Sequence, residues 1–140
     1  MLMSNSQHKW VWLDDVRPAP NATWHWVKDY DEFVKLTKTS MRPHTASLDH
    51  DLADVHYQAY HLRLRGFVQQ AKEVEAREKC GLDVVRFMIE TEWLPPRVII
   101  HSLNPAGVRN MVALLKDAGY RQSGYADVRG ACANSPVLLR

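Results

Sequence analysis

The amino-acid sequence predicts an α/β fold built around a mostly parallel sheet. Three short apolar runs, residues 10–13, 45–48 and 97–100, have the composition of buried strands, and polar residues follow each run directly. Between and after the runs, apolar residues stand three and four positions apart, which is typical of helices with one buried face. Strands that alternate with helices indicate a sheet covered on both faces, so we expect a three-layer sandwich.

The chain begins with two strands joined by a loop. Residues 10–13 and 24–28 are rich in aromatic and branched side chains that favour strands. Residues 16–23 lie between them and contain two prolines and an asparagine, which predicts a loop. A helix capped by Asp29 or Asp31 is expected next.

A helical insertion is expected after the third strand, residues 45–48. Within residues 52–79, apolar side chains between 57 and 74 follow helical spacing, and Gly66 interrupts the pattern. Such a stripe is typical of packing within a core. The alternatives are a contact between copies of the chain, which leaves the oligomeric state open, and a lid over the pocket.

The C-terminal part predicts two more helices and three more strands. Gly81 precedes one helix, and a strand follows at residues 97–100. Residues 105–117 predict the last helix, with proline at its start and glycine after its end. Residues 124–129 and 136–139 are two short candidate strands.

Composition limits the class of protein. A length of 140 residues corresponds to one domain, expected at residues 9–140 after a disordered lead-in at 1–8. Lys and Arg number 18 and Asp and Glu 16, so the net charge of +2 indicates no broad nucleic-acid or membrane surface. The two cysteines, Cys80 and Cys132, form no metal-binding pair, and no apolar run could span a membrane. We therefore expect a cytoplasmic protein.

Four carboxylates follow two of the predicted strands. Asp14 and Asp15 end the first strand, and Asp49 and Asp51 end the third. The carboxyl ends of parallel strands share one edge of a sheet, so these groups should repel one another unless a cation joins them. Oxygen ligands favour Mg²⁺ or Mn²⁺ as the cofactor. The alternative is that the acids cap helix starts and loop amides.

Two histidines are predicted at the same edge. His50 follows the third strand and His101 the fourth. A facing pair suits general acid–base catalysis, because one ring can donate a proton while the other accepts one. Opening a phosphodiester requires both roles. The alternative is a pair of structural or metal-binding histidines.

Residues suited to binding phosphate lie nearby. Ser102 and Asn104 precede a helix that begins at Pro105, and the free N–H groups of a helix start attract anions. Arg17 and Arg109 carry guanidinium groups that match phosphate oxygens. The alternative is that Asn104 only caps the helix and that Arg109 is solvated.

The chain resembles the cyclic-phosphate processing receiver-like domain family in four segments, which are WLDDVRPAP at 12–20, SLDHDL at 47–52, GLDVVRFM at 81–88 and HSLNPAGVRNM at 101–111. The resemblance implies a five-stranded, flavodoxin-like receiver sheet with strand order 2-1-3-4-5. It also implies action on cyclic phosphates, such as 2′,3′-cyclic RNA ends. The functional residues that it marks are Asp14, Asp15, Arg17, Asp49, His50, Asp51, His101, Ser102 and Asn104.

Two features depart from an ordinary phosphoacceptor receiver. No lysine follows Lys116, so the lysine expected after the last strand is missing. The interval between Asp15 and Trp24 is too short for a helical crossover, which predicts that the first helix is missing or that the second strand enters the sheet differently.

These observations lead to three hypotheses. The first is a phosphoesterase that opens a cyclic phosphate on an RNA end or a nucleotide, with His50 and His101 as acid and base and a divalent cation on the carboxylates. The second is a non-catalytic module that binds cyclic nucleotides as a sensor or sponge. The third is a degenerate receiver phosphorylated on Asp49.

Overall fold

The computed structural model describes residues 9–52, 54–75, 79–128 and 132–140, so the predicted lead-in at residues 1–8 lies outside the described part of the chain. The elements are β1 (Trp10–Leu13), β2 (Trp24–Val27), α1 (Tyr30–Thr39), β3 (Thr45–Leu48), α2 (Asp54–Leu64), α3 (Val68–Glu75), α4 (Gly81–Glu90), β4 (Arg97–Ile100), α5 (Pro105–Asp117), β5 (Arg121–Val128) and β6 (Cys132–Leu139). Among the described residues, no helix has the length and apolar character needed to cross a membrane.

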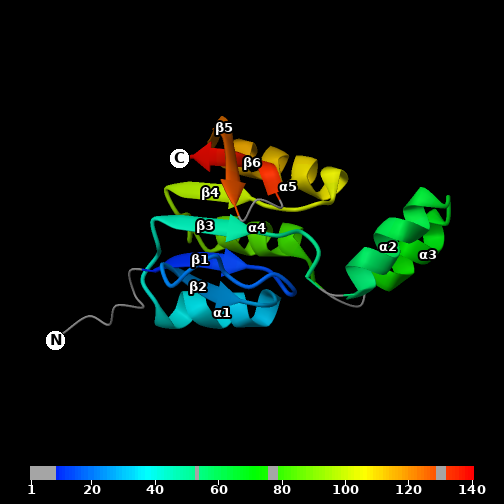
Figure 1. The fold of residues 1–140 in the computed structure, drawn as a ribbon, viewed down its shortest axis with the longest axis horizontal. Coiled ribbons are helices and arrows are strands. Elements are labelled where there is room, and N and C mark those ends of the chain that lie inside the picture. Colours follow the sequence, from blue (N-terminus) through cyan, green and yellow to red (C-terminus); the bar gives the residue numbers. More distant parts are fainter. Residues whose placement is uncertain (1–8, 53, 76–78, 129–131) are drawn as a thin grey trace.

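The strands form one mixed sheet of six strands in the order β2-β1-β3-β4-β6-β5 (Figure 1). The first four strands are parallel, as predicted, and their order is the expected one. The prediction of five strands is wrong. The chain after α5 forms two long strands, and β6 pairs antiparallel with both β4 and β5.

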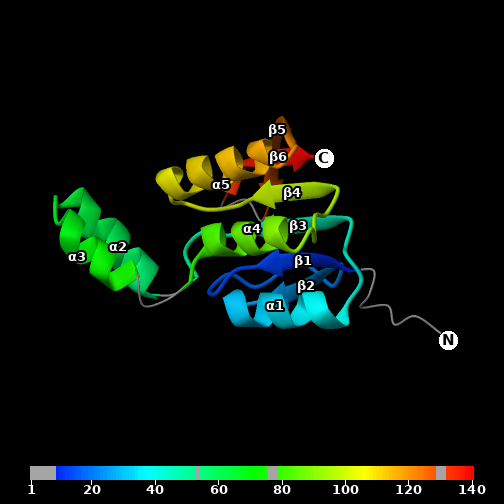
Figure 2. The ribbon, with the colours of Figure 1, turned by 180° about the vertical axis from the view of Figure 1, so that it is seen from behind.

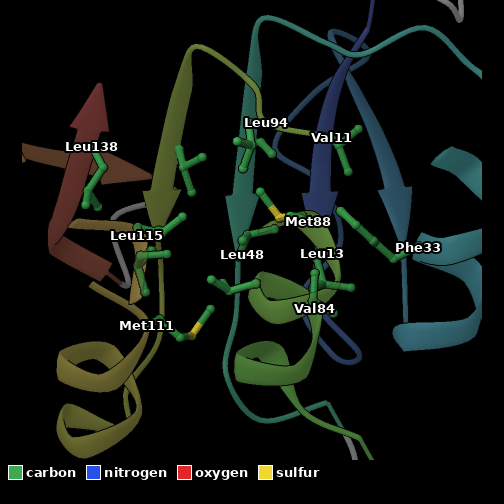
Figure 3. Packing of buried hydrophobic residues seen from close by; sticks show 14 of the residues in the cluster. Val11, Leu13, Phe33, Leu48, Val84, Met88, Leu94, Met111, Leu115 and Leu138 are labelled. Carbon is green, nitrogen blue, oxygen red and sulfur yellow. The ribbon is translucent and has the colours of Figure 1, made fainter. Parts of the chain in front are cut away.

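The prediction of three layers is also wrong, because α1, α4 and α5 all pack on one face of the sheet (Figure 2). Alternate residues of each strand point to this face. The helices contribute Phe33, Val84, Met88, Met111 and Leu115 to the main core, and the strands contribute Val11, Leu13, Leu48 and Leu138 (Figure 3). These side chains are buried, and they hold the carboxyl ends of the strands in register with the starts of α4 and α5.

The other face of the sheet carries tryptophans instead of helices. Trp12, Trp24 and Ile99 are buried there, and none of the described residues packed around them comes from a helix. The connection from β1 to β2 is a loop with no helix, and it covers part of this layer. The Trp12 indole N–H donates to the Arg17 carbonyl at 2.8 Å, and the Trp26 indole N–H donates to the Asp14 carbonyl at 2.7 Å. These two bonds fix the loop against the tryptophan layer.

The helical insertion consists of the two helices α2 and α3. Gly66, at φ +85°, makes the turn between them, which is the break that its place in the pattern predicted. Both helices stand beside the sheet and not on it (Figures 1 and 2). Ala59 and Ala71 are buried, so part of the apolar stripe packs within the insertion, whereas Leu64 and Val68 are exposed.

Candidate functional site

The site is built on the ends of three neighbouring parallel strands. Asp14 follows β1, Asp49 follows β3 and His101 follows β4. The backbone continues the ladder by one step past each strand: Asp49 N–H donates to the Leu13 carbonyl at 3.0 Å, and His101 N–H donates to the Leu48 carbonyl at 2.9 Å. The sheet therefore places these three side chains next to one another.

Asp14 is fully buried and is held on both oxygens. One oxygen accepts the backbone N–H groups of Val16 at 2.9 Å and Arg17 at 2.7 Å. The other accepts the Arg17 Nε–H at 2.8 Å and lies 3.1 Å from His101 Nε2. Burial raises the pKa of Asp14, but the bonds from His101 and Arg17 outweigh it and the net pKa is lowered. Asp14 is therefore a fixed carboxylate.

Asp14, Asp15 and Asp49 can point one carboxylate oxygen each to a common place, with these oxygens within 4.8 Å of one another. Arg17 partly compensates this charge, because its Nη2 lies 3.4 Å from Asp49. Burial, followed by repulsion from Asp14, raises the pKa of Asp49 to about 7, although Arg17 and the Ser102 hydroxyl oppose the rise. The three carboxylates are a donor set that fits a hard cation such as Mg²⁺ or Mn²⁺, and Arg17 contacts two of them.

His101 lies deeper than the sequence indicated. Its side chain is fully buried and stacks on Trp12, with the ring centroids 3.8 Å apart and the planes 6° from parallel. A carboxylate only accepts, so Nε2–H donates to Asp14 and Nδ1 accepts the Ser47 hydroxyl at 2.6 Å. Burial lowers the pKa of His101, outweighing the bond to Asp14. The ring supports Asp14 from the tryptophan face of the sheet.

His50 lies in a separate group on the helical face. Its Nδ1 is 2.6 Å from an oxygen of Asp51, and that oxygen also accepts the Asn104 side-chain amide at 3.1 Å. Burial lowers the pKa of His50, but hydrogen bonds with Asp51 and with the Cys80 thiol outweigh it and raise the pKa to about 9. The ring lies against Gly107 in α5, where a Cβ atom would overlap it.

A cavity of about 350 Å³ opens beside this histidine. Its walls include His50, Asn104, Cys80, Tyr60 and Arg63, which come from the ends of strands, the start of α5, the start of α4 and the insertion. Sequence reasoning missed the last three of these residues, because it found no metal-binding pair in the cysteines and interpreted the insertion chiefly as a packing element. The glycine directly after Cys80 was the available signal: Gly81 N–H donates to the His50 carbonyl at 2.7 Å, which brings the thiol to the ring.

The structure divides the predicted site residues into two groups. Asp14, Asp15, Arg17, Asp49, His101 and Ser102 form the strand-end group, and His50, Asp51 and Asn104 form the pocket group. The two histidines belong to different groups and do not form a facing pair. Asp51 pairs with His50 instead of joining the carboxylate cluster. Arg109 is exposed on α5 and lines a different cavity.

Asn104 joins the two groups to the start of α5. Its side-chain oxygen accepts the Gly107 N–H at 3.0 Å, which makes it the N-cap of this helix, as the alternative interpretation expected. Its backbone N–H also donates to Ser102 Oγ at 3.2 Å. The residue therefore caps the helix and orients Asp51 with the same side chain.

Comparison with known proteins gives one match. The family model described as Cyclic-phosphate processing Receiver domain matches residues 9–117, which include every residue of both groups. Neither a curated protein nor a solved structure matches the chain.

Proposed function

Because the chain belongs to the family of cyclic-phosphate processing receiver domains, we propose that it is a phosphoesterase that opens a cyclic phosphate, such as a 2′,3′-cyclic RNA end or a cyclic nucleotide. One observation carries the proposal beyond the family: His50 is fixed by Asp51 on the wall of a 350 Å³ cavity at the start of α5. The His50 ring, as a proton donor, and the anion-binding start of α5 therefore face the same cavity.

In the proposed reaction, the cyclic phosphate lies at the start of α5. The first turn of this 13-residue helix leaves the Ala106 N–H for the anion, since Pro105 has no N–H and Asn104 caps that of Gly107. The positive end of the helix dipole favours the anion as well, and the Ser102 hydroxyl lies nearby. A water oxygen forms a bond to phosphorus and one ring P–O bond breaks. The Asp49 carboxylate takes the proton from the water, and His50 gives a proton to the oxygen that leaves, so the product is a phosphomonoester.

Asp14 and Asp15 would hold the proposed divalent cation beside the Asp49 carboxylate, which acts as the base. Bound there, Mg²⁺ or Mn²⁺ would supply positive charge for the phosphate oxygens. Arg17 links the strand ends by contacting both Asp14 and Asp49. In this proposal His101 is a positioning residue that orients Asp14, and it does not touch the substrate.

Mass spectrometry tests the proposal on an RNA oligonucleotide with a 2′,3′-cyclic phosphate, with Mg²⁺, Mn²⁺ or EDTA present. We expect a mass gain of one water that is lost in His50→Ala. His61→Ala, which removes an exposed histidine of α2, is the matched control and should keep the activity. A folded His50→Ala variant with the wild-type rate would contradict the role of His50, and full activity in EDTA would contradict the cation.

The second candidate is a non-catalytic module that binds a cyclic nucleotide. One observation favours it: of the two histidines expected to act as acid and base, His101 is fully buried and only His50 reaches the cavity. This candidate predicts saturable binding and recovery of intact ligand after long incubation. A product in the wild-type reaction would exclude it.

A further inference from the structure

A second cavity lies on the other side of α5. It has a volume of about 650 Å³ and lies between α5 and the β5–β6 hairpin. Ala106, Gly107 and Asn110 of α5 face the His50 cavity, whereas Val108 and Val112 face this second one, which we call the α5–β5 groove. The helix thus stands between the two cavities.

The charges in the α5–β5 groove suit an anion with several phosphates. Arg109 and Lys116 are exposed, stand two turns apart on α5 and line the groove. Two helical turns are about 11 Å, so the two cations are spread along the groove instead of meeting at one point. None of the described residues that line it is acidic. A single phosphate does not need two separated cations, but a chain of phosphates does.

Apolar and aromatic surface accompanies these cations. Tyr125 of β5 is 64% exposed and Leu103, just before α5, is 70% exposed, and both line the groove. An exposed tyrosine ring offers a face on which a nucleic-acid base can stack without regard to its identity. Cations along a groove that also carries an aromatic side chain are the combination that binds single strands.

The groove is continuous with the proposed reaction site. Ser102 lines the α5–β5 groove, and its hydroxyl lies near enough to Asp49 of the strand-end group to lower the pKa of that carboxyl. A strand lying in the groove therefore ends beside the carboxylates and the start of α5. The His50 cavity receives the last ribose on the far side of the helix.

We propose that the α5–β5 groove binds the single RNA strand that carries the cyclic phosphate, so that the substrate is a polynucleotide end and not a free cyclic mononucleotide. The inference rests on the proposed function for the reaction and adds the class of substrate. Arg109 and Lys116 contact phosphates of the strand, and Tyr125 stacks on a base. A net charge of only +2 is compatible with this surface, because the cations are local to the groove.

The test compares kcat/KM for a short RNA with a 2′,3′-cyclic end and for the nucleoside 2′,3′-cyclic phosphate with the same last base. We expect a preference for the RNA of about tenfold or more in the wild-type protein. Lys116→Ala and Tyr125→Ala should each lower this preference about fivefold or more. Lys38→Ala, which removes an exposed lysine from α1, is the matched control and should leave it unchanged.

The outcomes separate the inference from the proposed function. Equal kcat/KM for both substrates, or an unchanged preference in both groove variants, would contradict RNA binding in the α5–β5 groove. The proposed phosphoesterase activity would remain. If neither substrate reacts, the proposed phosphoesterase activity is contradicted. Fluorescence anisotropy of a labelled RNA without a cyclic end then tests RNA binding in the groove. Weaker binding by Lys116→Ala than by Lys38→Ala then supports the groove, and equal binding overturns it.

Discussion

Gly107 determines where the His50 ring can lie. A Cβ atom at this position would overlap ring atoms of His50, and Gly107 N–H is already fixed by the Asn104 cap. We predict that Gly107→Ala displaces the ring and lowers turnover about 100-fold, because misplacing a catalytic group by about 1 Å has an effect of this size.

The same substitution should lower stability only slightly, because the preference of a helix interior for alanine over glycine, about 1 kcal/mol, offsets part of the cost of displacing the ring, about 1–3 kcal/mol. Steady-state kinetics should therefore show a much larger effect than thermal unfolding of the same variant. Wild-type turnover in Gly107→Ala would show that the position of the ring does not matter.

His101 is important for stability as well as for the site. Its ring is fully buried between Trp12, Ser47 and Asp14, so its removal leaves a cavity and two polar groups without their partner. We predict that His101→Ala lowers the free energy of unfolding by roughly 2–4 kcal/mol, measured by urea denaturation. A variant as stable as the wild type would contradict the supporting role, and His61→Ala, on an exposed residue, provides the baseline.

The sequence predicted which residues gather at the site, but it did not predict their depth. Asp14, Asp49 and His101 each follow an apolar run directly, and this pattern placed them correctly at one edge. The depth of His101 follows from the alternation of β4, because Ile99 and His101 point to the tryptophan face while Ile100 points to the helices. The separation of the two histidines could not be foreseen without knowing that no helix of the described residues covers the tryptophan face.

At the scale of elements, the α2–α3 insertion is the most separable part of the chain. Its helices pack chiefly on each other, and the chain returns to the sheet where Gly81 N–H meets the His50 carbonyl. We predict that replacing residues 53–78 by a short glycine-serine linker keeps the fold, with a thermal midpoint within a few degrees of the wild type.

The shortened protein should bind its substrate less tightly, because Tyr60 and Arg63 of α2 form one wall of the His50 cavity. We expect a higher KM with a smaller change in kcat, measured with the RNA substrate. Loss of the α/β circular dichroism spectrum in the shortened protein would show that the fold needs the insertion. An unchanged KM would show that Tyr60 and Arg63 do not contribute to substrate binding.

Elements with a clear hydrophobic pattern were predicted well, but the number of layers around the sheet was not. Helical spacing identified α1, α4 and α5, and the apolar runs identified β1, β3 and β4 with their parallel order. The run at 10–13 is apolar throughout, so it indicates a strand buried on both faces but not what covers each face. Here a loop and the β5–β6 hairpin lie over the tryptophans, where a third layer of helices was expected.

For the whole molecule, the balance of charge at the strand ends links the proposed cation to stability. The net charge is only +2, yet three carboxylates cluster where β1 and β3 end, and Arg17 contacts two of them. These strands lie in the middle of the sheet, so repulsion between their ends opposes the pairing that holds the fold together. A cation that bridges them would stabilise the folded state and not the unfolded chain.

We therefore predict that Mn²⁺ or Mg²⁺ raises the thermal midpoint, by roughly 5–10 °C at a concentration about 100-fold above its dissociation constant. Asp15→Asn should remove most of this rise, because it takes one charge from the cluster without emptying the buried core. Asp127→Asn makes the same chemical change on an exposed position of β5 and should keep the full rise. An equal rise in both variants would mean that the cation binds elsewhere, and no rise in the wild type would contradict a cation site at the strand ends.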